Sequence, residues 1–348
     1  MPLVSIIIPC YNEQNTITLL LEALLQQTIP IEKLEIIISD GMSTDKTLEV
    51  VSRYQAAHSE MEIVLVENKQ KTIPSALNRA LEIAKGEFIV RMDAHSIPAK
   101  DYVNRCITAL SSGLGDNVGG VWEIRAGNST WIARAIALAA AHPLGVGNAR
   151  YRTQGTKPSE NQPAGPADTV PFGSFRKDLL NQIGYFDENL LSNEDYEFNA
   201  RIRKNGGRIW LDPAIRTGYI ARSNLPDLAR QYWRYGYWKW RMLRQYLSTA
   251  RLRQVVPPLF VGSLITLIAM SIWPLWTQTL SFIPIAARWL LIGEIILYSL
   301  ILFLFALPYA IQKKEISLSI GIPLAIATMH ISWGSGFLVS LAKSIFEK

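Results

Sequence analysis

The chain has 348 residues, a length that suits about two domains. Its two cysteines, Cys10 and Cys106, exclude a disulfide framework, show no metal-ligand spacing and fit a reducing compartment. The net charge of +6 is local, because thirteen Lys and Arg but only two acids lie between residues 201 and 253. The N-terminus has no basic region before its apolar run, so we do not expect a secretory signal.

Short apolar runs alternate with stretches of helical spacing through the first 92 residues. The runs predict strands at 3–8, 35–39, 62–67 and 87–92, and the other stretches predict helices at 17–27, after 43–47 and at 72–85. Thr72 is a candidate cap of the last helix, and Pro74 suits its first turn. This order predicts an α/β fold whose mostly parallel sheet carries helices on both faces.

Polar residues follow these strands, and ligands of such sheets bind outside the carboxyl ends of the strands. Glu13 follows the first strand, Asp40 and Asp45 follow the second, and Asp93 and His95 follow the fourth. We therefore expect acids from three separate strand ends to approach one another. This convergence is the strongest purely physical indication of a binding site in the sequence.

The stretch SDGMSTDKT, residues 39–47, has two interpretations. Asp-Gly is a turn dipeptide, and Ser43, Thr44 or Asp45 can cap the following helix. We expect Asp45 to be the cap. Asp40 stands directly at the strand end and is better placed to meet a ligand, for example the donor groups of a base.

The stretch MDAHS, residues 92–96, places Asp93 and His95 at positions i and i+2. In an extended segment both side chains point the same way, so both can face one ion. Carboxylate plus imidazole is a partial shell for Mn²⁺, with pyrophosphate oxygens and water completing it, whereas Mg²⁺ prefers oxygen ligands. The alternative is that His95 only forms a hydrogen bond with a neighbouring loop.

The stretch LLSNEDYEFNARIRKNGG, residues 190–207, begins as a loop and enters a helix. Glu194 and Asp195 are either first-turn acids that complement the helix dipole or the source of a carboxylate base for a sugar hydroxyl. Neighbouring residues of a helix diverge by about 100°. Only one of the two is therefore expected to face a reacting centre.

Basic and aromatic residues mix in RQYWRYGYWKWRMLRQY, residues 230–246, where Trp233, Tyr237, Trp240 and Arg244 follow helical spacing. Such a segment can bind nucleic acid. Its place just before a long apolar run instead favours an interfacial helix at the lipid headgroups. We therefore expect a membrane as partner and no nucleic acid.

Three C-terminal runs, at 258–276, 289–311 and 318–341, are long enough to cross a bilayer. Basic residues before the first run and between the second and third place the large N-terminal part in the cytosol. Gly334 and Gly336 in the third run are expected to allow close helix packing. His330 in the same run is either a functional group or a satisfied packing residue.

Five stretches come in the order typical of one enzyme family: SIIIPCYNE at 5–13, SDGMSTDKT at 39–47, ALNRALEIAKGEFIVRMDAH at 76–95, FGSFRKDLLNQIGYFDENLLSNEDYEFNARIRKNGGRI at 172–209 and RQYWRYG at 230–236. On these stretches the chain resembles glycosyltransferase family 2, and more closely its membrane-bound succinoglycan-type glucosyltransferases. The resemblance runs from Val4 to about Tyr246 and continues more weakly through the apolar runs. It implies the Rossmann-like type-A glycosyltransferase fold, a nucleotide-sugar donor such as a UDP-hexose, and inversion at the anomeric carbon.

The resemblance also implies roles for single residues. It assigns donor binding to Pro9, Tyr11, Glu13, Asp40 and Asp93. Asp93 and His95 occupy the Asp-x-Asp position for a divalent metal, Mn²⁺ or Mg²⁺, and Asp195 corresponds to the catalytic base. The resemblance assigns acceptor or pyrophosphate binding to Glu194, Gln231 and Arg234. Gln231 and Arg234 are the first and fourth positions of a Gln-x-x-Arg-Trp motif. The chain departs from the family pattern at His95, which replaces an aspartate, and at Tyr235, which replaces the tryptophan.

We thus expect a cytosolic catalytic domain at 1–229, a basic-aromatic interfacial segment at 230–254 and a membrane domain at 255–348 with about three spans of the inner membrane. The expected reaction moves a sugar onto a lipid-linked saccharide in exopolysaccharide or cell-envelope glycan synthesis. Three spans leave little room for a polymer channel, so processive synthesis is not expected. The alternatives are transfer to a polyprenyl phosphate itself and a non-catalytic membrane scaffold, and the acids Asp40, Asp93 and Asp195 argue against the scaffold.

Overall fold

The computed structural model describes residues 2–155, 162–273 and 282–346. Contacts divide the chain into two units, which we call the sheet unit and the helical unit. The sheet unit comprises Met1–Ile124 and Ala149–Ile220, and the helical unit comprises Arg125–Asn148 and Ala221–Lys348. Residues 125–148 therefore group with the C-terminal helices, although they lie inside the predicted catalytic domain. The functional boundaries at 229 and 254 stay a prediction.

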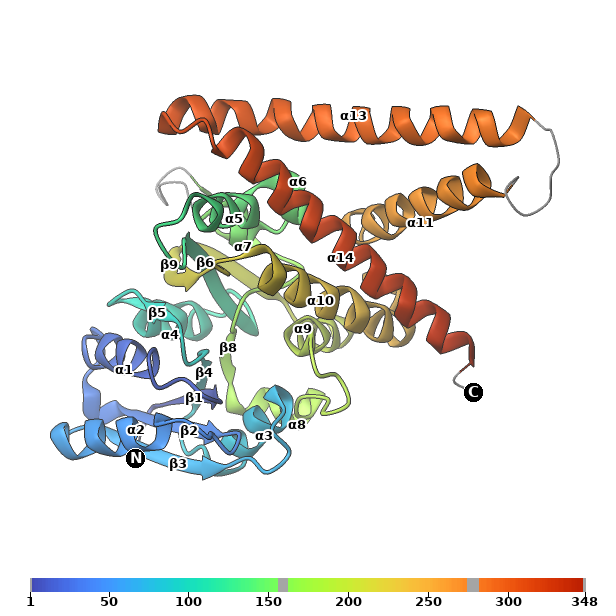
Figure 1. Ribbon diagram of the computed structural model, residues 1–348. Helices are drawn as coiled ribbons and strands as arrows, with labels where there is room; N and C mark the ends of the chain where they lie inside the picture. Colours follow the sequence, from blue (N-terminus) through green and yellow to red (C-terminus); the bar gives the residue numbers. More distant parts are fainter. Residues whose placement is uncertain (1, 156–161, 274–281, 347–348) are drawn as a thin grey trace. The chain divides into compact units, whose positions relative to one another are not determined.

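Within the described residues, the sheet unit is built on one nine-stranded sheet in the order β3-β2-β1-β4-β8-β6-β9-β5, with β7 paired to β9 (Figure 1). The strands are β1 (Val4–Cys10), β2 (Leu34–Asp40), β3 (Glu62–Glu67), β4 (Phe88–Arg91), β5 (Ile97–Pro98), β6 (Asn117–Arg125), β7 (Gly165–Pro166), β8 (Ser174–Arg176) and β9 (Ile209–Ile220). β3, β2, β1 and β4 run parallel, as the predicted alternation of strands and helices requires. β8 is antiparallel to β4 and β6, and β5 and β7 are antiparallel to β9. The parallel half carries the predicted site, because the carboxyl ends of β1, β2 and β4 share one edge.

Alternate residues of the parallel strands face two separate cores. Ile6 and Ile8 of β1 belong to one core and Ile7 to the other, and all three are fully buried. The first core is covered by α1 (Ile17–Leu25), α2 (Thr47–Ala57) and α4 (Tyr102–Ser111), the second by α3 (Ile73–Ile83), α8 (Leu180–Ile183) and α9 (Glu194–Lys204). Thr72 caps α3 as predicted, because its hydroxyl accepts the Ser75 N–H at 3.4 Å. Three short pieces, η1 (Ile31–Lys33), α7 (Arg150–Thr153) and η3 (Lys177–Leu179), complete the unit.

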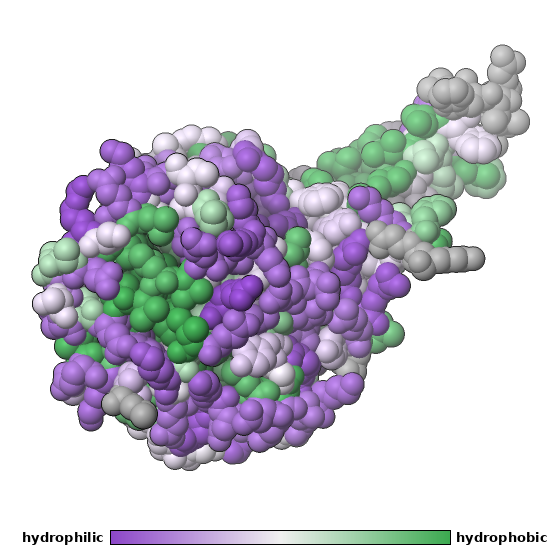
Figure 2. Space-filling model, turned by 90° about the horizontal axis from the view of Figure 1, so that it is seen from below, coloured by the Kyte–Doolittle hydropathy of each residue, from purple (hydrophilic) through white to green (hydrophobic). Residues whose placement is uncertain are grey.

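The helical unit contains α5 (Trp131–Ala141), α6 (Pro143–Val146), α10 (Leu225–Gln245), η4 (Leu247–Thr249), α11 (Leu252–Ile272), α13 (Phe282–Lys313) and α14 (Leu318–Phe346). In the part of the chain that the structure describes, α11, α13 and α14 are long and apolar enough to cross a membrane. They correspond to the three predicted runs, of which residues 274–276 lie outside the described residues. Large apolar side chains such as Leu259 and Trp289 are exposed on α11 and α13. Figure 2 shows apolar surface in green.

Glycines allow helix backbones of the helical unit to touch. A Cβ on Gly236 of α10 would lie 1.9 Å from the carbonyl oxygen of Trp333 on α14. A Cβ on Gly336 of α14 would in turn lie 2.2 Å from the carbonyl oxygen of Trp233 on α10. Gly334 meets α11 in the same way, at 2.5 Å from a carbonyl oxygen. The close packing predicted for Gly334 and Gly336 is confirmed.

His330 of α14 has partners on both ring nitrogens. Its Nε2 lies 2.7 Å from the Leu144 carbonyl oxygen of α6, and its Nδ1 lies 2.9 Å from the Tyr298 hydroxyl of α13. A neutral imidazole that donates at Nε2 and accepts at Nδ1 satisfies both contacts. Of the two interpretations of His330, the geometry supports the packing role.

Candidate active site

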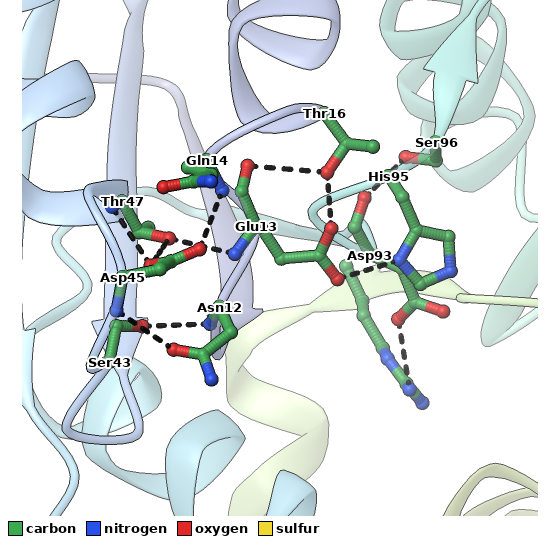
Figure 3. A network of polar contacts seen from close by, with 11 residues as sticks. Asn12, Glu13, Gln14, Thr16, Ser43, Asp45, Thr47, Asp93, His95 and Ser96 are labelled. Carbon is green, nitrogen blue, oxygen red and sulfur yellow. Dashed lines mark hydrogen bonds and ion pairs between the residues drawn. The ribbon is translucent and has the colours of Figure 1, made fainter.

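The carboxyl ends of β1 and β2 lie side by side, with Cys10 opposite Asp40. Asp40 is buried and binds its own loop, because its carboxylate accepts the Ser43 N–H at 2.9 Å and the Ser43 hydroxyl at 2.6 Å. The Asp45 carboxylate accepts the N–H of Thr47, the first residue of α2, at 2.9 Å. The cap position of α2 is Lys46 and not Asp45 as predicted, but Asp45 still bonds the first residue of the helix from the position before it. Figure 3 shows Ser43, Asp45 and Thr47 in this network.

Two further donor-binding candidates line the end of β1. Tyr11 is 50% exposed, and Pro9 is half-buried. The Tyr11 side chain also packs near Gly41, whose Cβ would lie 3.5 Å from it. An exposed aromatic ring at this edge can stack on a planar base.

Glu13 brings the ends of β1 and β4 together. Its Oε1 lies 3.0 Å from Nδ1 of His95, and its carboxylate also accepts the hydroxyl of Thr16 (Figure 3). Its backbone N–H donates to the Thr47 hydroxyl at 2.7 Å, which ties the loop after β1 to the start of α2. We expected acids from three strand ends to approach one another, and the contacts join Glu13 after β1 to His95 after β4 and to Thr47 at the start of α2.

The segment after β4 is a turn, so the extended geometry assumed for it is wrong. The N–H and the hydroxyl of Ser96 both donate to the Asp93 carbonyl oxygen, at 2.9 and 2.7 Å. The turn sends the two side chains to different partners. Asp93 contacts Arg91, whereas His95 contacts Glu13. Figure 3 shows the two side chains with these separate contacts.

Arg91, the last residue of β4, joins the strand end to α9. Its Nη2 lies 3.3 Å from Oδ1 of Asp93 and 3.0 Å from Oε1 of Glu194, and its Nη1 forms an ion pair with Asp195. The side chain of Arg91 is 3% exposed. Arg91 is not among the site residues predicted from the sequence. The available signal was a cation inside a strand that is otherwise apolar, because a buried arginine requires acidic partners.

Glu194 and Asp195 differ in their access to solvent. Both lie in the first turn of α9, which the chain enters from Asn193 in a left-handed conformation with φ 68°. One guanidinium reaches both carboxylates, yet the side chain of Glu194 is 8% exposed and that of Asp195 is 29% exposed. Asp195 is therefore the more accessible of the two, as a base for an external hydroxyl must be.

The residues at the end of β4 offer two groups to a divalent metal. Among the described residues, no group of three or more His, Cys, Asp or Glu could hold an ion. Asp93 and His95 are 27% and 36% exposed, and together they supply one carboxylate and one imidazole. These two groups are a partial donor set, and each already contacts another side chain, Asp93 with Arg91 and His95 with Glu13.

Gln231 and Arg234 lie on α10 in the helical unit. Gln231 Nε2 donates to the Tyr235 hydroxyl at 2.9 Å, and Arg234 is exposed. Their action together with Asp195 stays a prediction.

Comparisons with known proteins agree with this arrangement. The model of glycosyl transferase family 2 matches residues 5–184. A dolichyl N-acetyl-alpha-D-glucosaminyl phosphate 3-beta-D-2,3-diacetamido-2,3-dideoxy-beta-D-glucuronosyltransferase of Methanococcus voltae is 30% identical over 253 residues, which are 70% of this chain and 75% of that protein. The succinoglycan biosynthesis protein ExoA of Rhizobium meliloti (strain 1021) is 27% identical over 340 residues, 95% of this chain and 93% of that protein.

A solved structure shows the same fold. The mannosyltransferase PcManGT from Pyrobaculum calidifontis, in complex with GDP-Man and Mn²⁺, matches with a TM-score of 0.62 and 18% identity, over 98% of this chain and 88% of that one. The sheet unit thus has the type-A glycosyltransferase fold, and three apolar helices that are able to span a membrane follow it. Because the family match covers more than half of the chain and includes β1, β2 and β4 with their polar ends, the protein belongs to glycosyltransferase family 2.

Proposed function

We propose that the protein transfers a hexose from a nucleotide-sugar, of the UDP type, to a lipid-linked saccharide at the cytoplasmic face of the inner membrane. The observation that carries this proposal is the pairing of an accessible Asp195 with a buried Glu194 next to the strand-end residues Arg91 and Asp93. Three candidate spans in the same chain support an acceptor that itself resides in the membrane.

The reaction is a single displacement. The acceptor hydroxyl attacks the anomeric carbon, the bond from that carbon to the diphosphate oxygen breaks, and Asp195 accepts the hydroxyl proton. Attack from the face opposite the leaving group inverts the anomeric centre. The diphosphate leaves with the electron pair of the broken bond, so the site must stabilise negative charge.

The other candidate residues act on the donor. Tyr11 and Pro9 contact the nucleoside, and Asp40 orients the base from the end of β2. Asp93 and His95 would hold Mn²⁺ or Mg²⁺, which supplies positive charge to the departing diphosphate. Glu13 fixes the His95 ring by its contact with Nδ1 at 3.0 Å, as carboxylates do for metal-binding histidines.

A panel of radiolabelled nucleotide-sugars on membranes that contain the protein tests the proposal. One donor is expected to label a lipid-linked product, and EDTA is expected to abolish the labelling until Mn²⁺ or Mg²⁺ is restored. Asp195→Asn is expected to lose on the order of 10²–10⁴-fold in rate, because a general base contributes that much. Asp178→Asn, an exposed aspartate of the same unit, is the matched control and is expected to keep wild-type activity.

The products separate the proposal from its alternatives. A monosaccharide linked through phosphate to lipid and released by mild acid would favour transfer to a polyprenyl phosphate. Full transfer by Asp195→Asn would refute the base assignment. A purified protein that neither binds nor hydrolyses any donor in the panel would favour the scaffold.

A further inference from the structure

One buried cation faces three acids at the predicted centre. Arg91 contacts Asp93 on the loop after β4 and both Glu194 and Asp195 on α9. Arg91 therefore links the loop after β4 to the first turn of α9 through ion pairs. On the same edge, Glu13 contacts His95.

Glu194 and Asp195 are adjacent acids that contact the same cation. Two neighbouring carboxylates repel each other, and a positive charge that contacts both offsets this repulsion. A base must be ionised to accept a proton from the acceptor. The Arg91 guanidinium faces Asp195 with Nη1 and Glu194 with Nη2, so one cation forms ion pairs with both carboxylates.

We propose that Arg91 is a positioning residue that keeps Asp195 ionised and aimed at the acceptor by holding Glu194 and Asp195 on its two nitrogens. This inference rests on the proposed role of Asp195 as the base. Arg91 itself is too buried to contact the acceptor, since 3% of its side chain is exposed. It acts through Asp195.

The test is the pH profile of kcat/KM, measured with the donor that the wild-type protein uses in the panel. Arg91→Met keeps the length of the side chain and removes its charge. We expect the acidic limb of the profile to move to higher pH by about one to three units, because loss of a neighbouring opposite charge has an effect of this size. Activity is expected to recover at alkaline pH, and the KM for the donor is expected to change less than kcat.

A second substitution supplies the matched control. Glu194→Gln in the Arg91→Met background removes the competing negative charge, and the limb is expected to return toward its wild-type position. Arg91→Lys, whose single ammonium cannot span two carboxylates, is expected to shift the limb by a smaller amount. This conservative variant keeps the inference testable if Arg91→Met does not fold, as judged by thermal melting.

The outcomes distinguish the two proposals. An equal loss at every pH in Arg91→Met, without recovery by Glu194→Gln, would mean that Arg91 only supports the fold and would overturn the inference. The inference would also be overturned if the acidic limb of the kcat/KM profile of Arg91→Lys stayed at its wild-type pH. Full transfer by Asp195→Asn would instead refute the base assignment, whatever the profile of the Arg91 variants.

Discussion

Cys10 lies at the end of β1 beside the candidate site, and its surroundings suppress its reactivity. Burial, followed by the negative charges of Glu13, Asp40 and Asp45, raises the pKa of the Cys10 thiol above its usual range. Burial likewise raises the pKa of Cys106 to about 12. A raised pKa lowers the thiolate fraction at pH 8, and the thiolate is the species that reacts with maleimides.

We therefore expect neither cysteine of the native protein to react quickly with N-ethylmaleimide at pH 8. Labelling is expected to be at least ~100-fold slower than in the unfolded chain, because both the thiolate fraction and access to the reagent fall. Intact-mass spectrometry is expected to show no added label in the native state and two labels after unfolding in detergent. Rapid labelling of Cys10 alone would show that the edge of the sheet beside the site opens in solution.

The candidate site was only partly predictable from its residues. Glu13, Asp40, Asp93 and His95 follow apolar runs, so their place at the strand ends follows from the alternation of strands and helices. The turn at Asp93 was not predictable, because a hydrogen bond from Ser96 sets it. The role of Arg91 was also hidden. The apolar run Phe88–Arg91 predicts a strand, but this pattern does not indicate which acids the one buried cation at its end contacts.

At the scale of elements, the crossing of α10 and α14 depends on two glycines. Gly236→Leu and Gly336→Leu are each expected to destabilise the helical unit by at least about 1–3 kcal/mol, because the new side chain meets backbone that has no room to move. Scanning fluorimetry in detergent measures the loss as a lower melting temperature. Gly293→Leu on α13 is the control, because nothing lies within 4 Å of a Cβ there. Equal melting temperatures of Gly236→Leu and Gly293→Leu would contradict the crossing.

The elements after residue 98 were harder to predict than those before it. The first four strands are apolar runs between helices, whereas β6 contains Gly119 and Gly120 and β9 contains Pro213. Such residues weaken a strand signal. In β6 they have a structural reason, because a Cβ on Gly120 would lie 1.8 Å from the carbonyl oxygen of Ile215 in β9. The spans were predicted by hydropathy, since apolar composition and length alone determine them.

At the scale of the whole molecule, the grouping of residues 125–148 with the C-terminal helices makes a truncated chain informative. A chain that ends at residue 229 retains α5 and loses α14, against which α5 packs. Trp131 and Ala135 of α5 lie beside Gly321 of α14, so the truncation exposes this apolar contact. We expect the truncated chain to aggregate on size-exclusion chromatography without detergent, as exposed apolar patches cause association.

The full chain provides the comparison. It is expected to stay in the membrane fraction after washing with alkaline carbonate and to become monodisperse only in detergent, because α11, α13 and α14 have the length and composition of spans. A truncated chain that elutes as a stable monomer would show that α5 is held without α14. That outcome would support an independent domain that ends at residue 229.

The pairing of α5 with α14 also orders events during synthesis. α5 ends at Ala141 and α14 begins at Leu318. At about 5–20 residues per second, on the order of ten seconds or more separate the emergence of the two helices from the ribosome. Through this interval α5 is an apolar helix without its final partner. The helical unit is completed only when the last helix arrives, so a ribosome that stalls before Leu318 releases a protein with every strand of its sheet and an unfinished second unit.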